Sequence, residues 1–100
     1  MANIIRVFKA RVKSGKQEEF KSFFLDHALP MIRDQKGLVS VQIGLPRKEA
    51  PLEFLMITSW KSVQALQDFS GENRQQAVID PRERHLLEST AVDHYDEAFI

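Results

Sequence analysis

The sequence predicts an α+β domain in which strands and helices follow one another in the order βαββαβ. Three observations support this order: alternating apolar residues in strand-length stretches, helical spacing in the segments between them, and capping or helix-breaking residues at the junctions. A chain of 100 residues with a hydrophobic fraction of 43% is sufficient for one core. We therefore expect a single domain over residues 1–100.

Four stretches have the composition of β-strands, and we expect strands at residues 4–12, 38–45, 52–60 and 90–99. The first alternates strictly, with Arg6 on the same side as Phe8. The third is apolar on both sides, since Phe54 and Met56 face one way while Leu55 and Ile57 face the other. A sheet with a solvated back would show polar residues on one side, so the back of this sheet is expected to pack on a second copy of the chain.

The first helix is expected after Ser14, which is placed to cap it, with Gln17 reaching back in a capping box. Pro30 should bend this helix or end it early, and Gly37 is a credible left-handed stop. The apolar spacing predicts an inward stripe of six residues: Phe20, Phe23, Phe24, His27, Met31 and Ile32.

The second helical region is expected to be interrupted. Ser62 should cap a short helix whose apolar residues are Val63, Leu66 and Phe69, and the Ser-Gly pair at 70–71 should break it. A further helical piece is expected at 73–79, followed by a turn that Asp80 caps and in which Pro81 takes the first helical position. The whole order is the ferredoxin-like arrangement, a four-stranded antiparallel sheet with helices on one face.

Composition excludes several classes of function. The formal net charge is zero, which argues against nucleic acid and anionic membranes as partners, and the absence of cysteine excludes disulfides and thiolate chemistry.

The three histidines form no close pair for a metal, and no glycine-rich nucleotide motif is present. "PLEFLMITSW" lacks the basic-Gly-aromatic signature of an RNA-recognition strand. The N-terminus shows no apolar run of signal-peptide length, so a cytoplasmic location is expected.

Four segments carry a resemblance to a known family: "VKSGKQEEFKSFF", "GLVSVQIG", "FLMITSWKSVQALQDF" and "VDHYDEAF". Together they resemble the antibiotic biosynthesis monooxygenase domain, of the dimeric α/β-barrel group. The resemblance implies a homodimer whose two sheets form a barrel, with a pocket in each subunit between sheet and helices. Several members oxidise phenols or quinols with molecular oxygen and with no metal or flavin, so no cofactor is expected here.

Other members of the family degrade haem, and the residues argue against that activity in this chain. The haem-degrading branch carries an asparagine in the first strand, a second tryptophan and a histidine. By spacing, these positions are taken here by Phe8, Phe69 and Ile79. Phe8 offers no amide and Ile79 cannot ligate iron.

Cofactor-free oxygenation requires an apolar pocket, a base and a few hydrogen-bond donors. His27 is the first candidate base, with a core histidine as the alternative; Trp60 is the second catalytic candidate, with a structural role at the barrel rim as the alternative. The residues expected to bind the substrate are Phe8, Phe23, Phe24, Phe69, His85 and Tyr95.

Three further residues have conditional roles. His94 and Asp96 share a strand face, as a base and its orienting group or as a solvated pair. Arg6 is a buried charge with an anion-binding role if its side of the strand meets the helices, and a rim residue otherwise.

The predicted function is a small cofactor-independent monooxygenase that acts on an electron-rich aromatic molecule. Two alternatives remain open: a non-catalytic dimer that binds a small apolar ligand, and an isomerase or cyclase on the same barrel, which would use the same base and pocket.

Overall fold

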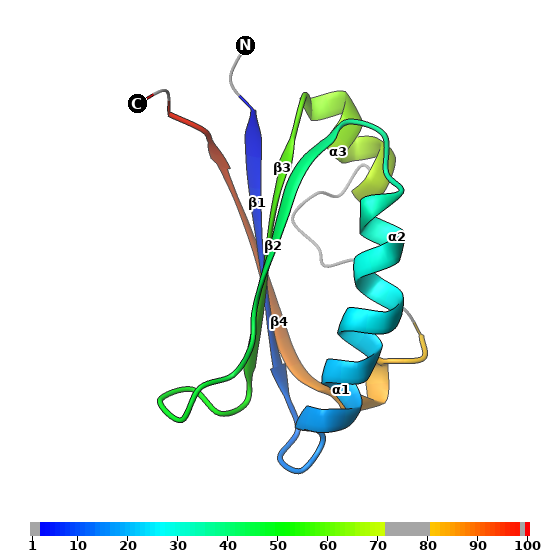
Figure 1. Ribbon diagram of the computed structural model, residues 1–100, viewed down its shortest axis with the longest axis vertical. Coiled ribbons are helices and arrows are strands. Elements are labelled where there is room, and N and C mark those ends of the chain that lie inside the picture. Colours follow the sequence, from blue (N-terminus) through cyan, green and yellow to red (C-terminus); the bar gives the residue numbers. More distant parts are fainter. Residues whose placement is uncertain (1–2, 72–80, 99) are drawn as a thin grey trace.

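The four predicted strands form one antiparallel sheet in the computed structural model, which describes residues 3–71, 81–98 and 100. The strand order is β2-β3-β1-β4 (Figure 1). The strands are β1 (Ile4–Val12), β2 (Leu38–Gly44), β3 (Glu53–Trp60) and β4 (Leu87–Asp96). The ferredoxin-like α+β prediction is therefore confirmed. The last strand begins and ends three residues earlier than the expected range of 90–99, whose residue 99 lies outside the described residues.

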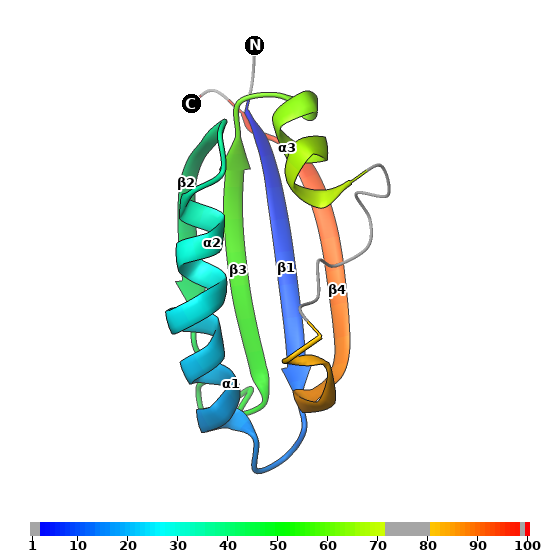
Figure 2. The same cartoon turned by 90° about the vertical axis from the view of Figure 1, so that its right-hand side faces the viewer.

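The described helices all lie on one face of the sheet (Figures 1 and 2). Their bounds are α1 (Gln17–Phe23), the π-helical turn η1 (Phe24–Ala28), α2 (Leu29–Arg33), α3 (Val63–Ser70) and the short 3₁₀ turn η2 (Arg84–Leu86). The continuous helix formed by α1, η1 and α2 lies over β2 and β3, while α3 lies toward β1 and β4 (Figure 2). The expected helical piece at 73–79 and the Asp80 cap lie outside the described residues.

The predicted start of the first helix is wrong. Lys16 occupies the N-cap position and makes no side-chain capping bond, so Ser14 does not cap the helix. Gly15 adopts a left-handed φ of +87°, which inserts a turn between Ser14 and the helix. Gln17 does reach back, but its Oε1 accepts a hydrogen bond from the Gly15 N–H, at 2.9 Å.

Pro30 does not end the helix early, since α2 continues to Arg33, and a π-helical turn precedes the proline. The Leu29 N–H donates to the Phe24 carbonyl, five residues back. This wider turn accommodates a proline that has no N–H of its own to donate. It also keeps a stripe spaced by four residues facing the sheet: Phe20, Phe24, Ala28 and Ile32.

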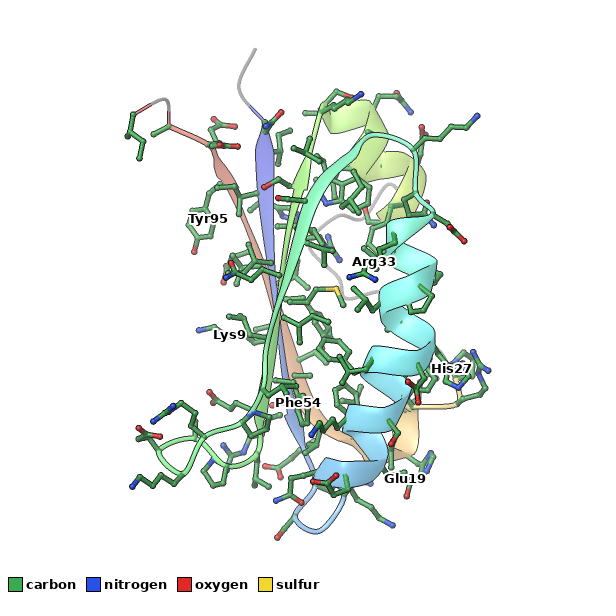
Figure 3. All side chains as sticks on the ribbon, viewed as in Figure 1. Lys9, Glu19, His27, Arg33, Phe54 and Tyr95 are labelled. Carbon is green, nitrogen blue, oxygen red and sulfur yellow. The ribbon has the colours of Figure 1, made fainter. Side chains whose placement is uncertain are left out.

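The inward stripe therefore differs from the predicted one. Phe20, Phe24 and Ile32 are buried as predicted, but His27 is exposed and points away from the sheet, and Met31 is 43% exposed (Figure 3). The prediction of an inward His27 is wrong because it assumes 3.6 residues per turn throughout, and the π-turn changes the phase. Ala28 takes the inward position instead.

The core lies between the sheet and these helices. Phe20 packs on Phe24 and Phe54, with ring centroids 5.2 and 4.8 Å apart. From β1, Ala10 and Val12 complete this cluster at 0% exposure. On β2, a register shift lies between Leu38 and Ser40, and Val39 within it is exposed, whereas Val41 packs against the core.

The first helix of the second helical region, α3, begins and ends as predicted. Ser62 is the N-cap of α3, and its Oγ accepts a hydrogen bond from the Ala65 N–H at 3.1 Å. Gly71 ends the helix with a φ of +80°. Leu66 is buried as expected, whereas Val63 is exposed.

The opposite face of the sheet carries no helix among the described residues (Figure 1). Its centre is apolar: Val7 pairs with Ile57, and both are only half-buried. Lys9 and Tyr95 also project from this face (Figure 3). Within residues 3–71 and 81–98, no helix combines the length and the apolar character needed to span a membrane.

Gly37 generates the first testable prediction. Its φ is +83°, and a Cβ added there would overlap the Ala65 side chain of α3. We expect Gly37→Ala to lower the free energy of unfolding by about 3 kcal/mol, from left-handed strain together with overpacking. Urea unfolding at equilibrium measures this change.

Gly15→Ala is the matched control, because Gly15 has a similar φ of +87° but open space around its Cα. We expect it to lose only the left-handed term, about 1 kcal/mol. Equal losses in the two variants would show that the contact between Gly37 and Ala65 contributes nothing to stability.

Candidate functional site

A small cavity lies between the helices and the strands β1 and β3, with a volume of about 40 Å³. Most of its wall is apolar: Phe8, Phe24, Ala28, Met31, Ile32, Met56 and Phe69. Three polar residues also line it: Arg6, Thr58 and Glu83. An apolar cavity with a few polar groups on its wall is the usual form of a small-molecule site.

The polar wall comes from one row across three strands. Arg6 on β1 is paired with Thr58 on β3 and with His94 on β4. Residues directly opposite one another in antiparallel strands share a face and have neighbouring Cβ atoms. The row therefore places a hydroxyl, a guanidinium and an imidazole side by side on the face that meets the helices.

Arg6 is the most unusual member of the row because it is only 2% exposed. Its Nη1 lies 3.0 Å from His94 Nε2, and its guanidinium lies 5.7 Å from the centre of the Phe69 ring. Burial lowers the pKa of Arg6, since desolvation disfavours the charged form. Arginine still carries its proton, so it donates to His94, and the accepting Nε2 then bears no hydrogen. The condition set for an anion-binding role, that Arg6 faces the helices, is met.

Trp60 lies outside the cavity wall and contacts two of the residues that form it. It is completely buried, and its ring stacks on Phe69 with centroids 5.1 Å apart and an interplanar angle of 18°. Its indole N–H donates to the Thr58 hydroxyl oxygen at 2.9 Å. Trp60 thus fixes two residues that line the cavity, Phe69 and Thr58, but does not itself line it.

Glu83 contributes a carboxyl group to the cavity wall. It precedes η2 and is only 5% exposed. A buried carboxyl beside an apolar cavity can accept a proton or a hydrogen bond from a bound molecule. The cavity therefore combines a cation, a hydroxyl and a carboxyl within a largely apolar wall.

The structure brings together only part of the predicted site. Phe8, Phe24 and Phe69 line the cavity, as expected of a shared pocket. Besides Trp60, four of the predicted site residues lie outside the cavity wall: Phe23, His27, His85 and Tyr95.

Each of these four has a physical reason for its position. The π-turn carries His27 outward, and Phe23 lies beside the inward stripe with its ring centroid 5.4 Å from that of His27. His85 is exposed, and its Nε2 atom lies 3.4 Å from Oε2 of Glu19. Tyr95 alternates onto the opposite face of the sheet and is 55% exposed.

Sequence reasoning missed Thr58, Glu83 and Ala28. Thr58 gave a signal, because it is a polar residue at an inward position two residues before Trp60. In the sequence, Glu83 gives only the signal of an acidic residue in a helix start, three residues after Asp80. Ala28 could be found only through the π-turn. Within the part of the chain that the structure describes, no three acidic or histidine side chains gather as a metal site.

The bond between Thr58 and Trp60 generates a testable prediction. Thr58→Val keeps the side-chain shape but leaves a buried indole N–H without its acceptor. We expect it to lower the free energy of unfolding by about 2 kcal/mol. Thr90→Val on β4, where the threonine is exposed, is the control and should change stability by less than about 0.5 kcal/mol. Urea unfolding would contradict the argument if the two variants were equally stable.

Comparison with solved structures supports the fold. The chain is similar to a protein of unknown function from Nitrosomonas europaea, with a TM-score of 0.79, 16% identity and coverage of 100% of this chain and 93% of that one. A protein from Shewanella oneidensis gives a TM-score of 0.78 and 18% identity, with 96% and 91% covered. Among curated proteins, none matches the sequence significantly.

A third similar structure is that of a mutant of SnoaB, a cofactor-independent oxygenase from Streptomyces nogalater. Its TM-score is 0.74 at 17% identity, with 100% of this chain and 97% of that chain covered. At these identities the structural matches establish the fold. The family model for antibiotic biosynthesis monooxygenase matches residues 3–81, most of the sequence. The chain therefore belongs to the antibiotic biosynthesis monooxygenase family.

Proposed function

We propose that the protein is a cofactor-independent monooxygenase that oxidises a small electron-rich aromatic molecule of the phenol or quinol type. The observation that carries the proposal is the cavity, whose wall includes three phenylalanine rings together with a buried carboxyl, guanidinium and hydroxyl. Membership of the family and the likeness to an oxygenase of the same fold support the same reaction class. The substrate, in this proposal, supplies the electrons.

The overall reaction balances without a redox cofactor. One atom of dioxygen enters the substrate as a carbonyl oxygen, and the other leaves as water with two hydrogens that the substrate loses. The protein must hold the ring in a dry site, remove a proton and stabilise the resulting anion. Phe8, Phe24 and Phe69 provide the apolar wall, and Arg6 provides a positive charge for the anion.

Glu83 takes the role of proton acceptor in this proposal. The sequence favoured His27 as the base, but that side chain is exposed and lies away from the cavity wall. Glu83 is buried and lines the cavity. A positioned carboxylate typically contributes about 10²–10⁴-fold to a rate as a general base.

Oxygen uptake by the purified, metal-stripped protein tests the proposal directly. Candidate substrates are compact hydroquinones and dihydroxyarenes, with product mass read under ¹⁸O-labelled dioxygen. We expect protein-dependent uptake and one labelled oxygen per product molecule. Absence of uptake with every substrate would favour the binding-protein or isomerase alternatives.

Turnover by the Glu83→Gln variant tests whether Glu83 is the base. We expect turnover to fall by about 100-fold or more, because glutamine keeps the shape of the side chain but cannot accept the proton. Glu88→Gln is the matched control. Glu88 is exposed, and its Oε1 forms an ion pair with Nε of Arg11 at 3.4 Å. Wild-type turnover in Glu83→Gln would remove Glu83 from the mechanism.

We further propose that two copies associate through the face of the sheet that lacks helices. Val7 and Ile57 form an apolar centre on this face, and Tyr95 adds a ring that is 55% exposed. A hollow of about 370 Å³ lies beside the β2–β3 connection and includes Lys9 and Leu55. Burial of the apolar centre at Val7 and Ile57 between two copies supplies the free energy of association.

Light scattering at micromolar concentration should give the mass of a dimer. Val7→Lys places a charge at the centre of the proposed interface and should produce monomers, while Val63→Lys, at an exposed position on α3, should leave the dimer intact. A wild-type monomer would contradict the proposed association.

A further inference from the structure

We propose that the cavity between the helices and the strands β1 and β3, in the form that the structure shows, is a dry site for one molecule of dioxygen. The use of the bound gas rests on the proposed function, whereas its binding does not. The site would hold the oxidant before an aromatic substrate enters. Three properties of the cavity support this: its volume, the composition of its wall and the hydrogen bonding of the polar groups beside it.

The volume of the cavity fits a diatomic molecule. The cavity measures about 40 Å³. A cavity needs about 10–15 Å³ to hold one water molecule, and a dry engineered cavity that binds benzene measures about 150 Å³. The space therefore corresponds to about two or three heavy atoms, which is too little for an aromatic ring and enough for dioxygen. An aromatic substrate requires the cavity to widen, whereas dioxygen does not.

The wall of the cavity suits an apolar guest. Four wall residues belong to the continuous helix formed by α1, η1 and α2, and all are apolar: Phe24, Ala28, Met31 and Ile32. Met56 adds a buried thioether from β3. Dispersion is the main attraction available to a molecule that has neither charge nor dipole, and methionine sulfur is polarisable. The helix side of the cavity therefore provides the contacts that dioxygen can make.

The polar groups beside the cavity do not call for a water molecule. A buried water typically bonds to about two to four polar groups that would otherwise lack partners. Among the described residues, every buried side-chain nitrogen or oxygen atom already has a hydrogen-bond partner. The Thr58 oxygen accepts the Trp60 N–H at 2.9 Å, and Nη1 of Arg6 lies 3.0 Å from Nε2 of His94. An apolar guest therefore displaces no tightly held water from the cavity.

Met31 gives dioxygen a route into the cavity. It belongs to the wall and is 43% exposed, so the wall reaches the molecular surface at this residue. Its unbranched side chain is flexible, and exposed side chains change rotamer within picoseconds to nanoseconds. Entry of a diatomic molecule therefore does not depend on a rearrangement of the helix.

Paramagnetic relaxation by dioxygen tests the site in the absence of any aromatic substrate. We would measure the relaxation of ¹³C-labelled methyl groups in protein equilibrated with dioxygen and then with argon. Dioxygen is paramagnetic and accelerates the relaxation of nuclei close to it. We expect a several-fold larger effect at Met56 and Ile32, in the cavity wall, than at Val12 and Leu86, which are similarly buried outside it. An equal effect in the two pairs would overturn the inference.

Filling the cavity tests whether its wall holds the gas. Ala28→Leu places a larger side chain in the cavity and should remove the excess relaxation at Met56 and Ile32. Ser22→Leu, at an exposed position of α1, is the control and should retain the excess. An excess that survives Ala28→Leu would contradict the proposed site. If Ala28→Leu does not fold, Ala28→Val decides: it should reduce the excess, and an unchanged excess would count against the site.

Two further measurements separate the dry site from a hydrated cavity and from the proposed function. Cross-relaxation between the Met56 methyl group and water would reveal a bound water in the cavity and would reject the dry site. Excess relaxation in the cavity wall, with no oxygen uptake from any substrate, would retain the gas site and reject the oxygenase. Oxygen uptake without the excess relaxation would retain the oxygenase and reject the gas site.

Discussion

The burial of one guanidinium on a central strand is the constraint on which the site depends. Arg6 is 2% exposed on a strand whose other inward residues are apolar. A charge in such a position requires polar or polarisable neighbours, because removing it from water is costly. His94 accepts one of its hydrogen bonds, and the face of Phe69 lies 5.7 Å from it. Phe69 is in turn fixed by Trp60, and Trp60 is fixed by Thr58.

These contacts form a closed chain around one end of the cavity. Arg6 and Thr58 are register partners, so the last residue in the chain lies beside the first. A change at Trp60 would therefore reach the cavity through two routes, the ring of Phe69 and the hydroxyl of Thr58. This explains how a tryptophan that does not line the cavity can still determine its polarity and shape. Its role is to position the residues that do.

The fold could be predicted from the sequence because its signals are local. Alternation in residues 4–12, the Ser62 cap and the left-handed glycines at 37 and 71 each depend on a few neighbouring residues. The Ser14 cap failed for an equally local reason, since the φ of Gly15 displaced the start of the helix. The dimer and the chemical roles depend on other molecules, so their prediction has to be tested in solution.

The site was harder to predict because it depends on register and helix phase. Arg6, Thr58 and His94 are far apart in sequence, and only the pairing of three strands brings them into one row. Without the π-turn, regular helical spacing would direct His27 inward, as the sequence suggested. The π-turn directs Ala28 to the wall instead, and Ala28 leaves space where a larger side chain would fill the cavity.

Because Ala28 and not His27 lies at the cavity wall, the chemistry that the fold can perform is different. A histidine at this position of the helix would place a polar group opposite the sheet, whereas with alanine the four wall residues described on this helix, Phe24, Ala28, Met31 and Ile32, are all apolar. All the described polar groups of the wall then belong to β1, β3 and the segment before η2. In the proposed function, the substrate meets these polar groups, and the apolar stripe of α1, η1 and α2 packs against its ring. In that proposal, Arg6, Thr58 and Glu83 orient the substrate, and the phenylalanine rings contribute the affinity. A helix of regular pitch could not separate the two functions in this way, because the same stripe would have to supply both.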